Sequence, residues 1–157
     1  SNGRLCLCGY SSGGHCASLY ALSASAPRFE SVVLISGLYN LRTHAWTGFR
    51  RFLAPIFNFV YSEILGLATA KDRDRESPEF LAPTSKANLD GQKWFVLSAK
   101  MELMGLEPFQ DIFFQAEPLC TALRMRGAKV DRVTCGLNHW LLVINIADFL
   151  KPYCQGL

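Results

Sequence analysis

Near the start of the chain, a short apolar run, a serine between glycines and an amphipathic helical pattern follow one another, and this succession restricts the possible folds most. The apolar run covers residues 4–8, the serine lies in Gly9-Tyr10-Ser11-Ser12-Gly13, and apolar residues recur at three- and four-residue steps over residues 16–22. Residues 31–35, Ser-Val-Val-Leu-Ile, are typical of a strand covered on both faces of a parallel sheet. The pattern predicts a β-α-β unit.

The later part of the chain continues the alternation of strand and helix. A buried strand is expected at residues 94–97 and a last strand at residues 130–134, while residues 109–126 carry a helical stripe. Pro118 lies inside that stripe and predicts a kink or a split helix. A last helix is expected at residues 140–150. We therefore predict an α/β fold with a parallel sheet and flanking helices.

Between the second and third expected strands the pattern is irregular. Residues 36–90 hold an aromatic-rich stretch and a charged run, which predict a cap-like helical insertion at residues 42–80 with one or two helices. The longest apolar stretch, residues 52–70, is interrupted by polar residues such as Asn58 and Glu63. It therefore predicts a helix of the cap or core and no membrane span.

The composition suits one compact domain. Half of the 157 residues are hydrophobic and 18% are charged, which is enough apolar material for a sizeable core. The formal net charge is +3, and the basic residues are scattered rather than collected in one block. We therefore expect no nucleic-acid partner.

The six cysteines do not form the pattern of a disulfide scaffold or a metal site. The chain is too long and apolar for a disulfide framework, so reduced thiols in the core are expected. Cys6 and Cys8 are two residues apart, but no second close pair or nearby histidine completes a zinc site. We expect no metal and no cofactor. Residues 1–4 lack a secretory signal pattern, which favours the cytoplasm.

The motif at residues 9–13 has the form G-x-S-x-G and lies between a predicted strand and a predicted helix. A serine on such a sharp turn is strained, and glycines two residues before and two after it relieve the crowding. The turn presents the Ser11 hydroxyl outward as a nucleophile. The backbone N–H of Ser12, at the positive end of the helix, is placed to stabilise an oxyanion.

A serine hydroxyl is a weak nucleophile, so Ser11 requires a base that a third group orients. Of the three histidines, His15 lies on the first turn of the following helix and is expected to point into or along the sheet, and His44 lies in the irregular insertion. His139 follows the last strand, at the edge of the sheet where Ser11 also lies. It is therefore the predicted base.

The acid that orients the base is expected on the loop after the preceding strand. Glu102 follows the strand end most closely, and Glu107 and Asp111 are later competitors. Each of these carboxylates alone is typical of a solvated loop or a helix cap. The chain order serine, acid, histidine favours Glu102, with Asp111 as the alternative.

The segments that carry these residues resemble the esterase and lipase branch of the α/β hydrolases that includes kynurenine formamidase and prenylcysteine methylesterase-like proteins. The matching segments are Gly9-Tyr10-Ser11-Ser12-Gly13-Gly14-His15, Ile35-Ser36-Gly37-Leu38-Tyr39-Asn40-Leu41, Glu76-Ser77-Pro78 and Asn138-His139-Trp140. The resemblance covers nearly the whole chain and implies triad roles for Ser11, Glu102 and His139. It also implies that residues 1–157 form the C-terminal portion of one α/β-hydrolase domain, a partial form of that fold.

Two functions of different classes are open. The first is a serine hydrolase that cleaves a carboxyl ester or an aryl formamide through an acyl-enzyme. The aromatic and apolar residues 46–70 favour a small uncharged substrate, and the resemblance suggests N-formylkynurenine. The second is a catalytically silent, hydrolase-like binding module. A cysteine hydrolase that uses Cys8 or Cys16 is disfavoured, because neither residue lies at the turn.

Overall fold

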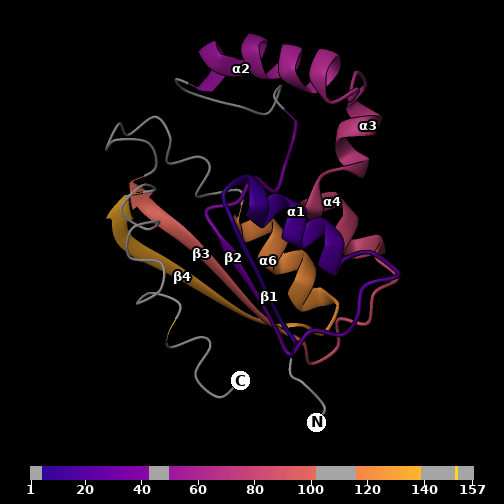
Figure 1. Cartoon of the computed structure of the whole chain (residues 1–157), viewed down its shortest axis with the longest axis vertical. Helices are drawn as coiled ribbons and strands as arrows, with labels where there is room; N and C mark the ends of the chain where they lie inside the picture. The colour runs from indigo at the N-terminus through magenta and orange to yellow at the C-terminus, as the bar shows by residue number, and fades with distance from the viewer. Residues whose placement is uncertain (1–4, 43–49, 102–115, 139–150, 152–157) are drawn as a thin grey trace.

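Four parallel strands form the sheet in the computed structural model, which describes residues 5–42, 50–101, 116–138 and 151. The strands are β1 (Cys6–Tyr10), β2 (Ser31–Ile35), β3 (Lys93–Met101) and β4 (Lys129–Asn138), and they lie in this order across the sheet (Figure 1). Every neighbouring pair is parallel. The prediction of an α/β fold with a parallel sheet is confirmed.

The first β-α-β unit has the predicted form. β1 is followed by α1 (Ser12–Ala21), and β2 pairs along its whole length with β1 on one side and β3 on the other. All residues of β2 are buried, as expected for an inner strand of a parallel sheet. β1 continues through Gly9 to Tyr10, so the turn begins at Ser11 itself.

β3 and β4 are longer than the apolar runs at residues 94–97 and 130–134 predict. They pair with each other as far as Met101 and Asn138, and the part of β3 after Leu97 lies past the end of β2. There each strand supplies the backbone hydrogen bonds of the other, so the pairing can extend without a continued apolar pattern. The extra length carries both strands further along the edge at which β1 and β2 end.

The helices α1, α4 (Pro78–Leu81) and α6 (Ala116–Met125) lie on one face of the sheet (Figure 1). Successive residues of a strand face opposite sides, so β2 contributes to two clusters. The larger cluster includes Ala17, Leu22, Val32, Leu34, Trp94, Leu119 and Leu123. The smaller cluster, on the other face, consists of Val33, Ile35, Leu97 and Ala99 with partly buried neighbours. The main core therefore lies under the helix that follows Ser11.

Pro118 does not interrupt the helix in which it lies. It is in the first turn of α6, where an N–H has no partner inside the helix and its loss costs little. The predicted kink is therefore not needed in the described part of this helix. Residues 109–115 and the helix expected at residues 140–150 lie outside the described residues.

The insertion after β2 has more helical turns than the one or two helices predicted. α2 (Arg50–Phe59) continues directly into a π-helical turn, η2 (Val60–Ile64), and α3 (Ala70–Arg75), α4 and the 3-10 turn η3 (Ala82–Thr84) follow. α2 lies apart from the sheet (Figure 1). Elements as short as α3 and α4 carry too few residues for an apolar period, so the sequence pattern missed them.

Most of the cysteines whose side chains the structure describes are not in the core. Cys120 is buried and Cys6 is half-buried, whereas Cys8 and Cys16 are exposed. The expectation of core thiols is therefore confirmed for Cys120 and is wrong for Cys8 and Cys16. These two lie on β1, at the edge of the described sheet, and on α1.

Candidate active site

Ser11 occupies the turn between β1 and α1 with a strained backbone. Its φ of 54° and ψ of −122° lie where residues with a side chain are rarely found. The turn is held on both sides: the Ser11 N–H donates to the Ile35 carbonyl (2.8 Å), and the Ser11 carbonyl accepts from the Gly14 N–H (2.9 Å). Such a conformation costs roughly 1–3 kcal/mol and typically persists where it serves a functional site.

Glycines provide the space for this turn, but not at every predicted position. A Cβ on Gly9 would lie 2.2 Å from the Gly13 carbonyl oxygen, and a Cβ on Gly14 would lie 3.2 Å from the Gly37 Cα. A Cβ on Gly13 would meet nothing within 4 Å. The prediction that glycines relieve the crowding is therefore confirmed for Gly9 and wrong for Gly13, whose place is taken by Gly14.

The hydroxyl of Ser11 is not used to cap the helix. Ser11 is the N-cap of α1, a position where serine side chains often accept a bond from the helix, yet its side chain makes no capping hydrogen bond. Ser12 is exposed and begins α1, where the first N–H groups have no partner inside the helix. Ser11 is half-exposed, and a nucleophilic hydroxyl next to a helix N-terminus has an oxyanion donor close by.

A second serine, Ser36, follows β2 in the way that Ser11 follows β1. Its φ is 47°, its N–H donates to the Leu97 carbonyl (2.8 Å), and its hydroxyl accepts from the Ala99 N–H (3.3 Å). Ser36 is buried. Hydrogen bonds thus join the carboxyl end of β1 to that of β2, and the carboxyl end of β2 to β3. Ser36 lies in the segment Ile35-Ser36-Gly37-Leu38-Tyr39-Asn40-Leu41, whose sequence pattern predicts no role for it.

His15 connects α1 to the segment that follows β2. Its Nδ1 donates to the Leu38 carbonyl (2.7 Å), and because a carbonyl only accepts, this nitrogen carries the proton. Desolvation lowers the pKa of His15 below its ordinary value, against the opposing effects of the Leu38 bond and the Glu76 charge. This hydrogen bond joins His15 to the segment after β2, a partner that the prediction of a side chain directed into or along the sheet did not include. His15 therefore links α1 to the segment after β2.

The structure describes the residues that directly precede the predicted acid and base. Met101 and Asn138 are partners in the register of β3 and β4. Both strands end at the edge of the sheet where Ser11 follows β1. The residues themselves, Glu102 and His139, together with the alternatives Glu107, Asp111 and His44, lie outside the described residues.

Among the residues that the structure describes, no three histidine, cysteine, aspartate or glutamate side chains gather so that they could hold a metal ion. No described helix is long and apolar enough to cross a membrane. Burial raises the pKa of the Cys120 thiol to about 11, so this cysteine is protonated at neutral pH.

A parallel sheet with a strained serine between a strand and a helix is the arrangement of the α/β-hydrolase fold. No protein-family model and no curated protein sequence matches the chain. Solved structures do match it.

An acylaminoacyl peptidase from Pyrococcus horikoshii has a TM-score of 0.63 and 14% identity, over 100% of this chain and 26% of the peptidase. Carboxyl esterase 2 from Tuber melanosporum has a TM-score of 0.61 and 19% identity, over 90% of this chain and 46% of the esterase. A thermostable esterase from Pseudomonas putida has a TM-score of 0.56 and 19% identity, over 98% and 46%. The chain thus has the α/β-hydrolase fold and spans a quarter to about half of the length of these proteins.

Proposed function

We propose that the chain carries the nucleophile side of a serine hydrolase that cleaves a carboxyl ester or an amide. The observation that carries this proposal is the backbone of Ser11, with φ at 54° and ψ at −122° between β1 and α1, together with a hydroxyl that makes no capping bond. A turn that only connects a strand to a helix has no need of this strained backbone conformation. A nucleophile gains exposure and a neighbouring helix N-terminus.

In the proposed reaction Ser11 Oγ attacks the substrate carbonyl while its proton passes to His139. The Ser12 N–H stabilises the developing oxyanion, and Glu102, or alternatively Asp111, orients the histidine. The carbon–oxygen or carbon–nitrogen bond to the leaving group then breaks, and the leaving group takes the proton. Water attacks the acyl-enzyme and regenerates Ser11. The pairing of Met101 with Asn138 supports this assignment, because these residues are bonded directly to Glu102 and His139.

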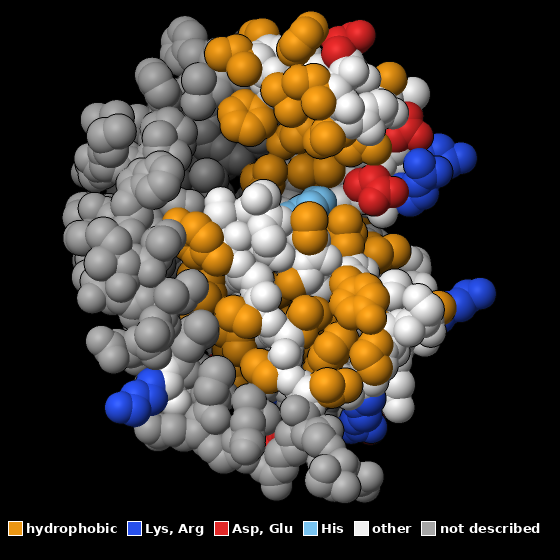
Figure 2. All heavy atoms as spheres, in the orientation of Figure 1, with side chains coloured by type: hydrophobic (Ala, Val, Ile, Leu, Met, Phe, Trp, Pro, Cys, Tyr) orange, Lys and Arg blue, Asp and Glu red, His pale blue; other side chains and the backbone are white. Residues whose placement is uncertain are grey.

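An uncharged substrate with an apolar or aromatic group fits the side chains of the insertion. Exposed apolar residues gather on α2 and η2 and on the segment just after them (Figure 2): Ile56, Phe59, Ile64 and Leu65 are 56–65% exposed. A short-chain or aryl ester follows from this composition, and an aryl formamide such as N-formylkynurenine follows from the resemblance alone. Rates on p-nitrophenyl esters compared with N-formylkynurenine distinguish the two, and a preference for strongly charged substrates would contradict both.

A fluorophosphonate probe tests the proposal, because it labels an activated serine and leaves an ordinary one unmodified. We expect the wild-type protein to be labelled, Ser11→Ala to lose both labelling and ester hydrolysis by several orders of magnitude, and Ser25→Ala, an exposed serine beyond α1, to behave like wild type. Absence of labelling in a folded wild-type protein would favour the silent binding module instead.

A further inference from the structure

The guanidinium of Arg73 donates hydrogen bonds to three consecutive segments of the insertion. From α3, Nη1 donates to Asn58 Oδ1 on α2 (2.5 Å), Nη2 donates to Ser62 Oγ on η2 (3.2 Å), and Nε donates to the Leu67 carbonyl (3.0 Å). The guanidinium also lies over the ring of Tyr61, 5.4 Å from its centroid, and Tyr61 is buried. One side chain therefore binds the end of α2, the π-helical turn and the segment after it.

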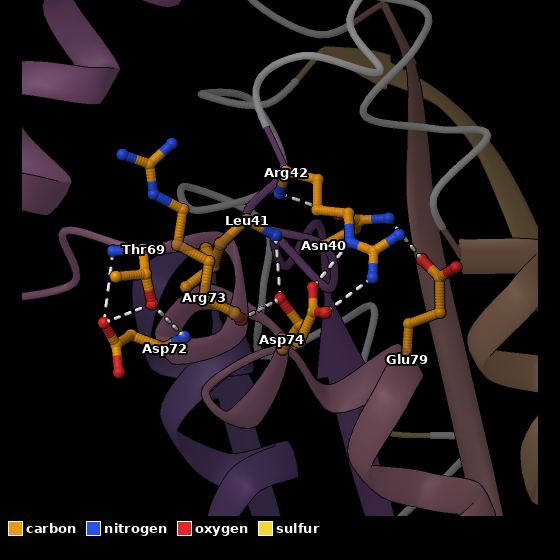
Figure 3. A network of polar contacts seen from close by, with 9 residues as sticks. Asn40, Leu41, Arg42, Thr69, Asp72, Arg73, Asp74 and Glu79 are labelled. Atoms are coloured by element: carbon orange, nitrogen blue, oxygen red, sulfur yellow. Dashed lines mark hydrogen bonds and ion pairs between the residues drawn. The ribbon is translucent and has the colours of Figure 1, made fainter.

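The next residue, Asp74, binds a different part of the molecule, the segment that follows β2. Its two carboxylate oxygens accept from Nε and Nη2 of Arg42, both at 2.5 Å, and this pairing raises the pKa of Arg42. Arg42 belongs to the segment that follows β2, and its guanidinium lies 4.2 Å from the centroid of the Phe80 ring. Figure 3 shows Arg73 and Asp74 extending from α3 to different sides.

Further bonds attach the same turn of chain to the segment after β2. The Ser77 hydroxyl donates to the Arg73 carbonyl (2.6 Å) and accepts from the Leu41 N–H (2.9 Å). The backbone of Arg73 is therefore linked through Ser77 to the segment after β2. Asn40 donates to Glu79 (2.9 Å) at the start of α4. By contrast, the main packing contact of α2 among the described elements is with η2. α3 therefore connects the α2–η2 segment to the segment that follows β2.

We propose that Arg73 is a specificity-determining positioning residue, which holds the exposed apolar side chains of the α2–η2 segment where an apolar acyl or aryl group of the substrate contacts them. Arginine suits this task because its planar fork donates to three acceptors at once, which a lysine ammonium cannot do with the same geometry. The residues of this segment that Arg73 contacts are buried or half-buried, whereas Ile56, Phe59 and Ile64 are exposed. This inference rests on the proposed hydrolase function for its consequence and on the contacts of Arg73 for its mechanism.

Arg73→Gln tests the proposal against Arg75→Gln, which removes an arginine from the same helix. The Arg75 side chain is 70% exposed and contacts only the nearby carboxylates Asp72 and Glu76 among the ion pairs described. We expect Arg73→Gln to accelerate amide hydrogen exchange over residues 56–67 by about tenfold or more, with unchanged exchange in residues 31–35. Arg75→Gln is expected to change neither. Equal exchange in the two variants would overturn the positioning role.

The second readout is selectivity. For Arg73→Gln we expect kcat/KM on p-nitrophenyl hexanoate to fall by about tenfold, mainly through KM, while the value for p-nitrophenyl acetate stays close to wild type. An equal loss on both esters would overturn the specificity role even if exchange increases. Failure of the hydrolase function itself is distinguishable, because the wild-type protein would then escape fluorophosphonate labelling whatever the exchange of residues 56–67 shows.

Discussion

The turn at Ser11 and the insertion from α2 to α4 are stabilised by different kinds of contact. At the turn, backbone atoms meet directly: Gly9 lies against Gly13, Gly14 lies against Gly37, and Ser11 bonds the end of β2. In the insertion, long charged and amide side chains make most of the bridging hydrogen bonds between segments, beside a backbone bond from the Glu79 N–H to the Tyr39 carbonyl (3.1 Å). The turn should therefore be sensitive to a single added atom, whereas the insertion should be sensitive to the loss of particular polar groups.

Gly9→Ala tests this difference where we expect the largest effect. The new Cβ would lie 2.2 Å from a backbone oxygen and 2.7 Å from the Ala17 Cβ, so the turn must shift. We expect a loss of unfolding free energy at or above the upper end of the roughly 1–3 kcal/mol typical of overpacking. A displacement of Ser11 by about 1 Å would also reduce kcat/KM by about 10²-fold. Denaturant unfolding and ester hydrolysis measure the two effects.

Gly13→Ala is the matched control, from the same motif. Its Cβ meets nothing within 4 Å and the residue lies in α1, so alanine should stabilise the helix by roughly 0.5–1 kcal/mol. If the two variants were equally destabilised, close backbone contact would not explain the glycines of this turn.

Ser36 combines a strained backbone with a side-chain hydrogen bond, and two substitutions separate the contributions of these features. Ser36→Ala keeps a Cβ at a φ of 47° and leaves the Ala99 N–H without this acceptor, so we expect a loss of about 1–3 kcal/mol. Ser36→Gly loses the same hydroxyl but adopts positive φ without cost, so it should be less destabilised than alanine. The reverse order in thermal unfolding would show that the backbone at Ser36 is not strained. Ser31→Ala, at the buried opposite end of β2, serves as a control for loss of a buried hydroxyl.

The same distinction explains which parts of the structure could be predicted from sequence. β2 and the turn at Ser11 are encoded locally, by an uninterrupted apolar run and by glycines at fixed distances, so both were found. The roles of Arg42, Arg73 and Asp74 depend on partners up to 32 residues away, and no local pattern reveals such a pairing. The lengths of β3 and β4 escaped prediction for a similar reason, since each strand extends only because the other pairs with it.

His15 offers a pH-dependent test at the contact between α1 and the segment that follows β2. Its folded pKa is lowered by desolvation, so the native state prefers the neutral ring. The resulting stability is fully present above the ordinary pKa of the unfolded chain, near 6.5, and is lost as the pH falls towards the folded value. His15→Gln keeps a donor for Leu38 but does not titrate. We expect its stability to vary less than wild type between pH 8 and pH 5, and parallel pH profiles would contradict this role.

Glu79, whose side chain is half-buried at the start of α4, should give the smallest effect. Desolvation raises its pKa, and the Asn40 bond and the Arg42 charge only partly oppose that increase. Because the folded pKa is raised, the native state holds the proton more readily than the unfolded chain. The stability from this group is therefore present at low pH and is lost as the pH rises through the folded pKa.

Glu79→Gln removes this titration while its amide oxygen can still accept from Asn40. We expect the variant at pH 7 to match wild type or exceed it in unfolding free energy by less than about 1 kcal/mol, because a partly exposed charge pair contributes little. The advantage should shrink as the pH is lowered towards 4, where the wild-type carboxyl becomes protonated. Denaturant unfolding at both pH values measures this change. A clear loss of stability at pH 7 would mean that the charge of Glu79 itself holds α4 against the segment after β2, and the insertion would then depend on ion pairs beyond the one between Arg42 and Asp74.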